Sequence, residues 1–337
     1  MKAKVWMVAK SFCEFPTSEN FVIEEQRLRD ELPSDAFLVE AVCWSVDPYS
    51  RAFDPPAGSP HIGLQVARVV QSKNSKFPVG SHVVGHFGWR THTLVEKESV
   101  RRAERHEHLE IVYPVPPDLG GLGLSAAVGV LVLGMPGFTS YLALQMLEAK
   151  PGQTIVVSSA AGAVGSILAQ LAKLNGCRVI GYTGADEKVE WLLGELQLDF
   201  AFNYNTCSLA DSLRAAAPRG VDMFLNCVGG TFANCVFQFL NQGARVCQCG
   251  SISGYNKRQK VKTKTSVAEG RGAKVLNVSV FGVRERWMSE ALPALLSLIK
   301  EGKLKYRECP YYGFEKLPQA LIDQSNGLNI GKVIVFA

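Results

Sequence analysis

The 337-residue sequence predicts an α/β protein with two parts, a β-rich N-terminal module and a doubly wound parallel sheet. From about Ser125 onward, buried strand patterns alternate with helical patterns, which is typical of βαβ units. Before that point, short β-branched runs are separated by Gly and Pro. Within the alternating part, residues 154–170 have the pattern of a strand, a small-residue turn and a helix. The rest of the chain is organised around this stretch.

The N-terminal module is expected to be small and barrel-like, and a strand at 331–336 is expected to return to it. These patterns divide the chain into a domain of residues 1–128, completed by 303–337, and a domain of residues 129–302. Strands are expected in the module at 4–8, 36–42, 65–70, 82–84 and 91–95. Strands of the parallel sheet are expected at 154–157, 177–182, 200–204, 221–225 and 244–248. Helices are expected at 139–148, from 166 onward, and at 188–196, 209–217 and 288–300.

Composition and charge exclude several classes of protein. A hydrophobic content of 47% with 20% charged residues is ordinary for a globular protein, and a net charge of +5 gives little reason to expect nucleic acid as a partner. The apolar stretch 119–144 contains Pro136 and six glycines, so it is interpreted as buried turns and helices rather than a membrane span. No signal peptide follows Met1. Nine cysteines without a C-x-x-C pair disfavour structural zinc and predict free thiols in the cytoplasm.

The turn at Ala160–Gly165 matches a dinucleotide fingerprint, with Ala160 in the first glycine position. Gly162 would let the backbone approach a pyrophosphate, and Gly165 would let the helix lie close to the strand. The N–H groups at the start of the helix would then face the phosphates. The alternative is a tight turn between strand and helix that holds no ligand.

The residues after the fingerprint favour NADP(H) over NAD(H). The acid that NAD-binding units place about twenty residues past the glycines is absent from residues 182–184. Asp186 and Glu187 come later, where they serve as acids of a first helical turn. Lys188 could meet a 2′-phosphate, and Arg178 is a weaker candidate. The alternative for Lys188 is a solvated helix lysine.

Two charged stretches have alternative interpretations. The segment 101–108 is interpreted as a solvated turn or helix, because His106 and His108 have no third metal ligand within sequence reach, and no metal is expected. The stretch Lys257–Lys264 is either a mobile basic loop or an anion-attracting lid or localisation signal.

With these pieces placed, the chain resembles the zinc-independent medium-chain dehydrogenase/reductases over essentially its whole length, and most of all their prostaglandin reductase, or leukotriene B4 12-hydroxydehydrogenase, group. This resemblance implies a Rossmann domain plus a GroES-like β-barrel domain, a homodimer, and NADPH as cofactor. The motifs that carry it are Val46–Arg51 (VDPYSR), Gly63–Ala67, Met135–Thr139, Ala160–Ser166, Asp186–Lys188, Phe202–Tyr204, Ile252–Asn256 and Asn329–Lys332.

The resemblance implies NADPH-dependent reduction of the carbon–carbon double bond of α,β-unsaturated ketones and aldehydes, such as 15-oxo-prostaglandins. It places Tyr49 at the substrate and Tyr255 beside the nicotinamide. Because the tyrosine that the family has in a later loop is missing here, Tyr255 or water would have to steady the enolate, which makes Tyr255 the candidate catalytic hydroxyl. The positions it implies for the cofactor are Gly162, Ala163, Val164, Gly165, Lys188, Tyr204, Cys227, Cys249, Gly250, Ser251, Ile252, Ser253, Gly254, Tyr255, Phe281, Gly282, Val283 and Asn329. The alternative roles are a barrel-wall aromatic for Tyr49 and a loop packing residue for Tyr255.

Three departures from the family pattern bear on activity. Asn226-Cys227 stands where the family has Asp-Asn, a basic stretch from Lys257 to Arg271 replaces a proline-rich loop, and Ala273 aligns with a family tyrosine. The first and third of these departures motivate one alternative to the enone reductase, a catalytically weakened NADPH-binding sensor or scaffold. The other alternative is an NADPH quinone reductase of the same superfamily, which would use the same hydride donor on a different acceptor. The expected partner is a small enone, with a carboxylated lipid suggested by the basic stretch, and neither nucleic acid nor a membrane is expected.

Overall fold

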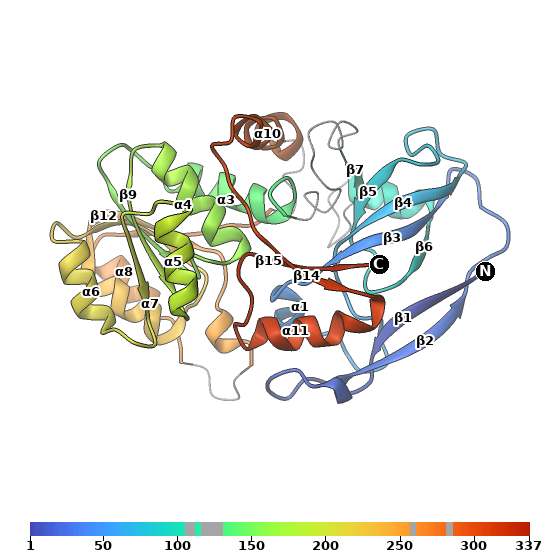
Figure 1. The fold of residues 1–337 in the computed structure, drawn as a ribbon, viewed down its shortest axis with the longest axis horizontal. Coiled ribbons are helices and arrows are strands. Elements are labelled where there is room, and N and C mark those ends of the chain that lie inside the picture. Colours follow the sequence, from blue (N-terminus) through green and yellow to red (C-terminus); the bar gives the residue numbers. More distant parts are fainter. Residues whose placement is uncertain (105–111, 116–130, 257–260, 281–285) are drawn as a thin grey trace. The chain divides into compact units, whose positions relative to one another are not determined.

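The computed structural model describes residues 1–104, 112–115, 131–256, 261–280 and 286–337. Residue contacts group the chain into two compact units (Figure 1). Unit 1 contains Met1–Gly134 and Glu308–Ala337, and unit 2 contains Met135–Val280 and Arg286–Arg307. The domain boundaries at 128 and 303 stay predictions.

Unit 2 is built on a parallel six-stranded sheet in the order β10-β9-β8-β11-β12-β13. The order reverses direction between β8 and β11, which is the switch point of a doubly wound sheet. The predicted α/β class, with a Rossmann sheet and a separate β-rich domain, is confirmed. The strands are β8 (Thr154–Ser158), β9 (Arg178–Thr183), β10 (Phe200–Asn203), β11 (Val221–Asn226), β12 (Leu240–Gln248) and β13 (Lys274–Asn277).

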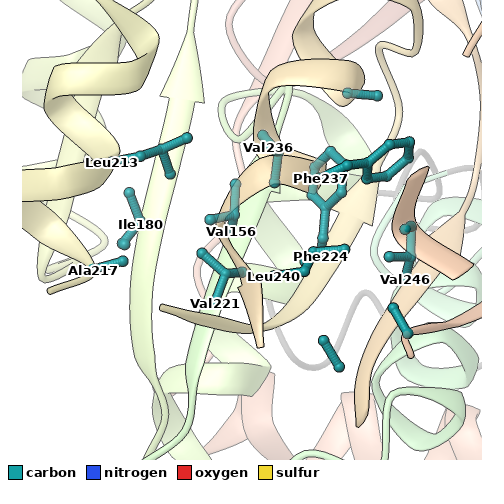
Figure 2. Close-up of a cluster of buried hydrophobic side chains, with 14 of the residues drawn as sticks. Val156, Ile180, Leu213, Ala217, Val221, Phe224, Val236, Phe237, Leu240 and Val246 are labelled. Carbon is teal, nitrogen blue, oxygen red and sulfur yellow. The ribbon is translucent and has the colours of Figure 1, made fainter. Parts of the chain in front are cut away.

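Helices cover both faces of this sheet, because its strands are apolar on both sides. On one face, Val156, Ile180, Phe224 and Val246 of the strands pack with Phe237 and with residues of α6, α7 and α8 (Figure 2). On the other side, α3 packs on α4, and α4 and α5 contact β8, β9 and β10. The helices are α3 (Met135–Met146), α4 (Ala163–Leu174), α5 (Asp186–Gly194), α6 (Leu209–Ala216), α7 (Gly230–Val236), α8 (Thr265–Gly270) and α10 (Leu292–Lys300), the last preceded by a π-helical turn at Trp287–Ala291.

Unit 1 is a β-rich module. Its larger sheet follows the order β14-β15-β3-β4-β5-β7, with β6 also paired to β3, and a separate hairpin joins β1 to β2. The strands are β1 (Lys2–Val8), β2 (Phe21–Arg27), β3 (Phe37–Ser45), β4 (Gln65–Ser72), β5 (His82–Gly85), β6 (His92–Val95), β7 (Val112–Pro114), β14 (Glu308–Tyr312) and β15 (Lys332–Phe336). The helices are α1 (Tyr49–Phe53), α2 (Lys97–Glu104) and α11 (Leu317–Ser325).

The return of the last strand to the N-terminal module is confirmed. β15 lies between β14 and β3, antiparallel to β3 and parallel to β14. Its residues Val333, Ile334 and Val335 have no exposed surface. Trp44 and Trp89 pack in the same core with Phe314 and Leu317, the residues that come before and at the start of α11.

The apolar stretch at 119–144 lies partly outside the described residues. Its described part is a buried turn followed by α3, which begins at Met135. Among the helices described, none is both long and apolar enough to cross a membrane.

Candidate active site

The fingerprint turn lies at the carboxyl end of β8 and leads into the first turn of α4. Ser159 has a positive φ of 50°, and the N–H of Gly162 donates to its carbonyl at 2.9 Å. Gly162 is the N-cap residue of α4, so Ala163, Val164 and Gly165 form the first turn, whose N–H groups have no acceptor within the helix. Anions bind at such a terminus because the helix dipole is positive there.

Gly165 is required by sterics. A Cβ at this position would lie 2.3 Å from the carbonyl oxygen of Ser159 and 2.9 Å from the Cα of Ala160. A Cβ at Gly162 would lie 3.2 Å from the same oxygen. The close approach of helix to strand that the fingerprint predicts is therefore present, and this cradle fits a dinucleotide pyrophosphate.

The neighbouring strand ends carry the candidates for the 2′-phosphate. Lys188 lies in the first turn of α5 and is half-buried. Tyr204 follows β10, and its hydroxyl would lie 2.7 Å from a Cβ on Gly184, so it covers the glycine that follows β9. Asp186 begins α5 and accepts a hydrogen bond from Asn203 at 2.7 Å, which confirms a first-turn role.

Arg178 lies at the amino ends of the parallel strands, opposite the ends that carry the fingerprint turn. It begins β9, its Nε donates to the carbonyl of Ala216 at 3.0 Å, and its guanidinium lies over the ring of Phe200. Because dinucleotides bind at the carboxyl ends of parallel strands, this position argues against Arg178 as a ligand of the 2′-phosphate.

The loop after β12 is bonded to the loop after β11. The N–H of Cys249 donates to Asn226 at 2.9 Å, and the N–H of Ile252 donates to Cys227 at 3.1 Å. The buried side chain of Asn226 joins both strands, since it donates to Gln248 and accepts from the N–H of Gly229 at 2.8 Å. The predicted cofactor residues Cys227 and Cys249–Tyr255 thus form one hydrogen-bonded unit beside the switch point.

Glycine is needed where the two loops touch. Gly229 has a φ of +72°, and a Cβ there would lie 2.2 Å from the Oγ of Ser251. Ser253 donates through its Oγ to the carbonyl of Val228 at 2.7 Å. These contacts fix the 251–254 turn against the start of α7.

Tyr255 is folded back against its own loop. Its hydroxyl oxygen accepts a hydrogen bond from the N–H of Ser251 at 3.3 Å, and burial raises the pKa of this phenol. The hydroxyl therefore stays protonated at neutral pH, and its proton is available to an acceptor.

Ala273, which aligns with the missing family tyrosine, lies at the amino end of β13, in the buried core of unit 2. The cofactor candidates lie at the opposite, carboxyl ends of the strands. Ala273 is thus not a position from which a hydroxyl would reach the cofactor, so this one of the three departures gives no structural reason to expect weakened catalysis.

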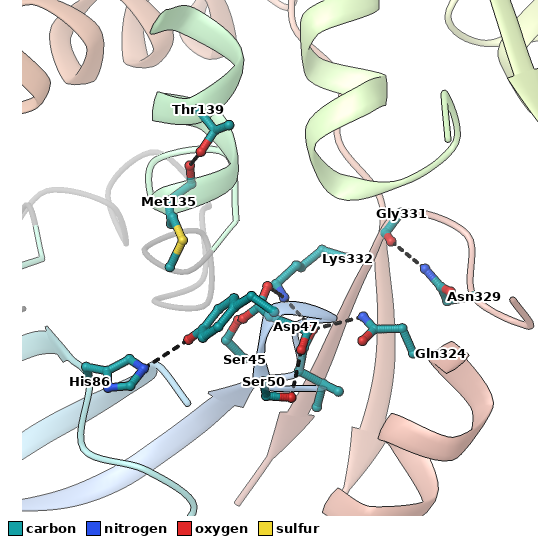
Figure 3. Close-up of polar contacts among 12 residues, drawn as sticks. Ser45, Asp47, Ser50, His86, Met135, Thr139, Gln324, Asn329, Gly331 and Lys332 are labelled. Atoms are coloured by element: carbon teal, nitrogen blue, oxygen red, sulfur yellow. Dashed lines mark hydrogen bonds and ion pairs between the residues drawn. The ribbon is translucent and has the colours of Figure 1, made fainter. Parts of the chain in front are cut away.

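In unit 1, a buried ion pair fixes the segment that carries Tyr49 (Figure 3). The ammonium of Lys332 is 1% exposed and lies 2.7 Å from both Oδ1 of Asp47 and the carbonyl of Val46. Ser45 donates to the other carboxylate oxygen of Asp47, and Ser50 donates to the Asp47 carbonyl at 2.9 Å. These bonds hold the chain between β3 and α1, which begins with Tyr49.

The Tyr49 hydroxyl lies 3.2 Å from Nε2 of His86, the residue that follows β5 (Figure 3). Burial raises the pKa of Tyr49 well above its usual range and lowers the pKa of His86 to about 4. Both groups are therefore uncharged at neutral pH. His86 was not among the predicted site residues, although the triplet Gly85-His86-Phe87, with its echo of the Gly-His-Glu of zinc-dependent relatives, was the signal that could have found it.

The remaining predicted residues are placed as follows. Asn329 donates through Nδ2 to the carbonyl of Gly331 at 2.9 Å, so its amide supports the approach to β15. Phe281, Gly282 and Val283 lie outside the described residues, as do His106 and His108 and the first part of the basic stretch. The described part of the basic stretch is hydrogen-bonded to α7. The side-chain amide of Asn234 donates to the carbonyl of Lys262 and accepts from the N–H of Lys264.

A dinucleotide cradle in unit 2 and a half-buried hydroxyl–imidazole pair in unit 1 are typical of a nucleotide-dependent oxidoreductase. Comparison with known proteins supports this class. Residues 4–103 match a family model described as the N-terminal domain of oxidoreductase, and residues 163–301 match one described as zinc-binding dehydrogenase. Among the residues the structure describes, no group of three or more His, Cys, Asp or Glu side chains could hold a metal ion.

Relatives that match over nearly the full chain show which oxidoreductases this protein resembles. The chain is 40% identical to prostaglandin reductase 1 of Rattus norvegicus, covering 100% of both chains, and 41% identical to that of Bos taurus, covering 99% of both. It is 30% identical to the NADPH-dependent curcumin reductase of Escherichia coli over 98% of this chain and 95% of the relative. The structure of CurA from Vibrio vulnificus in complex with NADPH matches with a TM-score of 0.87 at 28% identity, covering 99% of both chains. The chain belongs to the zinc-independent medium-chain dehydrogenase/reductases, among the relatives of prostaglandin reductase 1.

Proposed function

We propose that this protein reduces the carbon–carbon double bond of α,β-unsaturated ketones and aldehydes, with NADPH as the cofactor. The observation that carries the proposal is the half-buried Tyr49–His86 pair, a hydroxyl that stays protonated beside an imidazole that stays neutral. The names of the relatives, prostaglandin reductase 1 and NADPH-dependent curcumin reductase, support this assignment.

When bound, NADPH would supply the hydride for the β-carbon of the substrate. Negative charge then develops on the carbonyl oxygen, where a hydrogen-bond donor lowers the barrier because it is already in place. We assign this donor to Tyr49. When Nε2 of His86 carries a proton and donates to the Tyr49 oxygen, the hydroxyl proton of Tyr49 is free for the substrate. Solvent or a hydroxyl protonates the α-carbon.

NADPH consumption measured with a 15-oxo-prostaglandin, a medium-chain enone and a small quinone tests the reaction class, with NADH as the control donor. We expect the enones to have the highest kcat/KM and NADPH to be strongly preferred. A higher kcat/KM for the quinone would indicate a quinone reductase. Binding of NADPH without turnover of any acceptor would indicate a sensor or scaffold.

The role of Tyr49 is tested by Tyr49→Phe, which removes the hydroxyl and keeps the ring. We expect kcat/KM for enones to fall about 100-fold, the effect typical of losing one preorganised donor. Tyr312→Phe is the matched control, because Tyr312 is 70% exposed on β14. Equal rates for Tyr49→Phe and the unmodified protein would remove Tyr49 from the mechanism.

The described basic residues Lys262 and Lys264 support a carboxylated substrate, since both are exposed. Replacing both with glutamine should raise KM for a carboxylated enone and leave KM for a neutral enone unchanged. An equal change for both substrates would contradict this preference.

We also propose that the protein is a cytoplasmic homodimer. Nine free cysteines are in keeping with a reducing compartment. The dimer is inferred from the family resemblance alone, and light scattering on the purified protein would measure it directly.

A further inference from the structure

Two cysteines extend a strand register beyond the carboxyl ends of β11 and β12. These parallel strands pair Leu225 with Cys247 and Asn226 with Gln248. The next residues in the same register are Cys227 and Cys249. The two cysteines follow the last printed strand pair directly, and their side chains are hydrogen-bonded to each other.

The backbone around these thiols is fixed. The N–H of Cys227 donates to the Oγ of Ser158 at 2.9 Å, while the N–H of Cys249 donates to Asn226 at 2.9 Å. The N–H of Ile252 closes the other side by donating to the carbonyl of Cys227 at 3.1 Å. The two loops are thus hydrogen-bonded on both sides of the cysteine pair, which holds the backbone that carries the two thiols in place.

The two thiols are chemically unequal. They form a side-chain hydrogen bond that lowers the pKa of Cys249 and, together with burial, raises the pKa of Cys227. Both are half-buried, so a small reagent can reach them. Burial raises the pKa of Cys247 to about 12, and this third sulfur has no exposed surface. Cys249 is therefore the more nucleophilic member of the pair.

We propose that Cys227 and Cys249 are a redox modification site that closes to an intramolecular disulfide through exchange with a low-molecular-weight disulfide such as oxidised glutathione. The Cys249 thiolate attacks one sulfur of the reagent, forming a mixed disulfide and releasing one glutathione thiolate. Cys227 loses its proton and attacks the Cys249 sulfur, which releases the second glutathione. The protein loses two electrons and two protons, and one glutathione disulfide becomes two glutathione thiols.

The consequence for the cofactor rests on the proposed function. Both cysteines are candidate cofactor contacts, and their loops include the turn from Gly250 to Gly254. A covalent bond between the loops would change the surface offered to the nicotinamide half of NADPH, and bound NADPH would shield the thiols. Oxidation would thus lower the affinity for NADPH, and NADPH would slow oxidation.

The disulfide is tested on the full chain in glutathione buffers of increasing oxidation, followed by alkylation and peptide mass spectrometry. We expect a cross-linked peptide that joins Cys227 to Cys249. In Cys227→Ser, the intermediate should persist as a mixed disulfide of glutathione with Cys249. Cys235→Ser, on α7, is the matched control and should form the cross-link like the unmodified protein. Mixed disulfides on both cysteines without a cross-link would overturn the proposal.

Affinity for NADPH is measured on the same samples. We expect oxidation to raise the Kd by about tenfold, equivalent to about 1.4 kcal/mol, and dithiothreitol to reverse the change. The Kd of Cys235→Ser should respond in the same way, whereas Cys227→Ser should show no cross-link-dependent change. An unchanged Kd in the cross-linked protein would overturn the proposed effect of the disulfide on NADPH affinity. A reduced protein that binds no NADPH would instead contradict the proposed function. The cross-linking experiment would still test whether Cys227 and Cys249 form a disulfide, because it does not depend on NADPH binding.

Discussion

Gly165 lies on the first turn of α4, where its Cα faces the end of the fingerprint turn. Because an added Cβ would lie 2.3 Å from a backbone oxygen, Gly165→Ala must push α4 away from the Ser159 turn. We expect a loss of about 1–3 kcal/mol in the free energy of unfolding, typical of overpacking, and a weaker affinity for NADPH. Thermal denaturation and a fluorescence titration with NADPH measure the two effects.

Gly194→Ala is the matched control for this prediction. Gly194 ends α5, is exposed, and has no atom within 4 Å of an added Cβ. Alanine is the better helix former, so this variant should be neutral or more stable by up to about 1 kcal/mol. If both variants behaved alike, close packing at Gly165 would not be the reason for glycine there.

His61 links stability to pH. Its ring stacks on Trp89 with 3.9 Å between centroids, it has no exposed surface, and burial lowers its pKa to about 4. The unfolded chain takes up this proton near pH 6.5 and the folded chain near pH 4, so the free energy of unfolding falls as pH drops through that window. The full shift corresponds to about 3 kcal/mol.

Urea denaturation of His61→Gln from pH 7 to pH 4 measures this contribution. His86 has a similarly lowered pKa, so the variant should keep part of the pH dependence and lose about half of it. An unchanged pH dependence would show that His61 accepts its proton in the folded state as readily as in the unfolded state.

Among the elements, β15 is an internal strand of the larger sheet of unit 1, because it pairs with β14 at one edge and with β3 at the other. Ile334→Ala should cost about 2–5 kcal/mol of stability, the range for a large aliphatic side chain removed from a core. Val22→Ala on β2 is the control and should cost less than about 1 kcal/mol, since Val22 is 44% exposed. Chemical denaturation of both variants gives the comparison, and similar losses would contradict a core role for β15.

Some helices and strands could be predicted from sequence patterns and others could not. β8 and α4 were predictable because an apolar β-branched strand and a small-residue turn leave few alternatives. The sequence patterns do not predict β2, because its apolar and polar residues alternate irregularly and most of them are exposed. They do not predict β14 either, because Pro310 interrupts its pattern. The helix α4 begins three residues before Ser166, since small residues hide the helical period at its start.

The site was only partly predictable for a related reason. Gly162–Gly165 follow a local pattern, so their place at the end of β8 could be inferred from sequence. The pairing of Cys227 with Cys249 depends on the register between two strands, and the contact of His86 with Tyr49 joins β5 to α1. Such contacts between distant segments leave no local periodicity in the sequence.

At the scale of the whole molecule, the two units have separate cores and separate parts of the proposed chemistry. Hydrogen exchange with and without NADPH should therefore show protection confined mainly to the carboxyl edge of the unit 2 sheet, at residues 160–166 and 226–255. The hairpin of β1 and β2 should exchange equally in both states. Protection that is strongest in this hairpin would contradict the assignment of the cofactor to unit 2.

The position of β15 also has a consequence for synthesis of the chain. β3 is made early, but the strand that completes its pairing from Cys43 to Ser45 emerges only after all of unit 2. The sheet of unit 2 comes from one continuous segment, Met135 to Val280, so it can form while the edge of β3 in unit 1 that pairs with β15 is still unpaired. A nascent chain stalled before β15 would thus expose an apolar edge, and it is at this stage that chaperone binding would matter most.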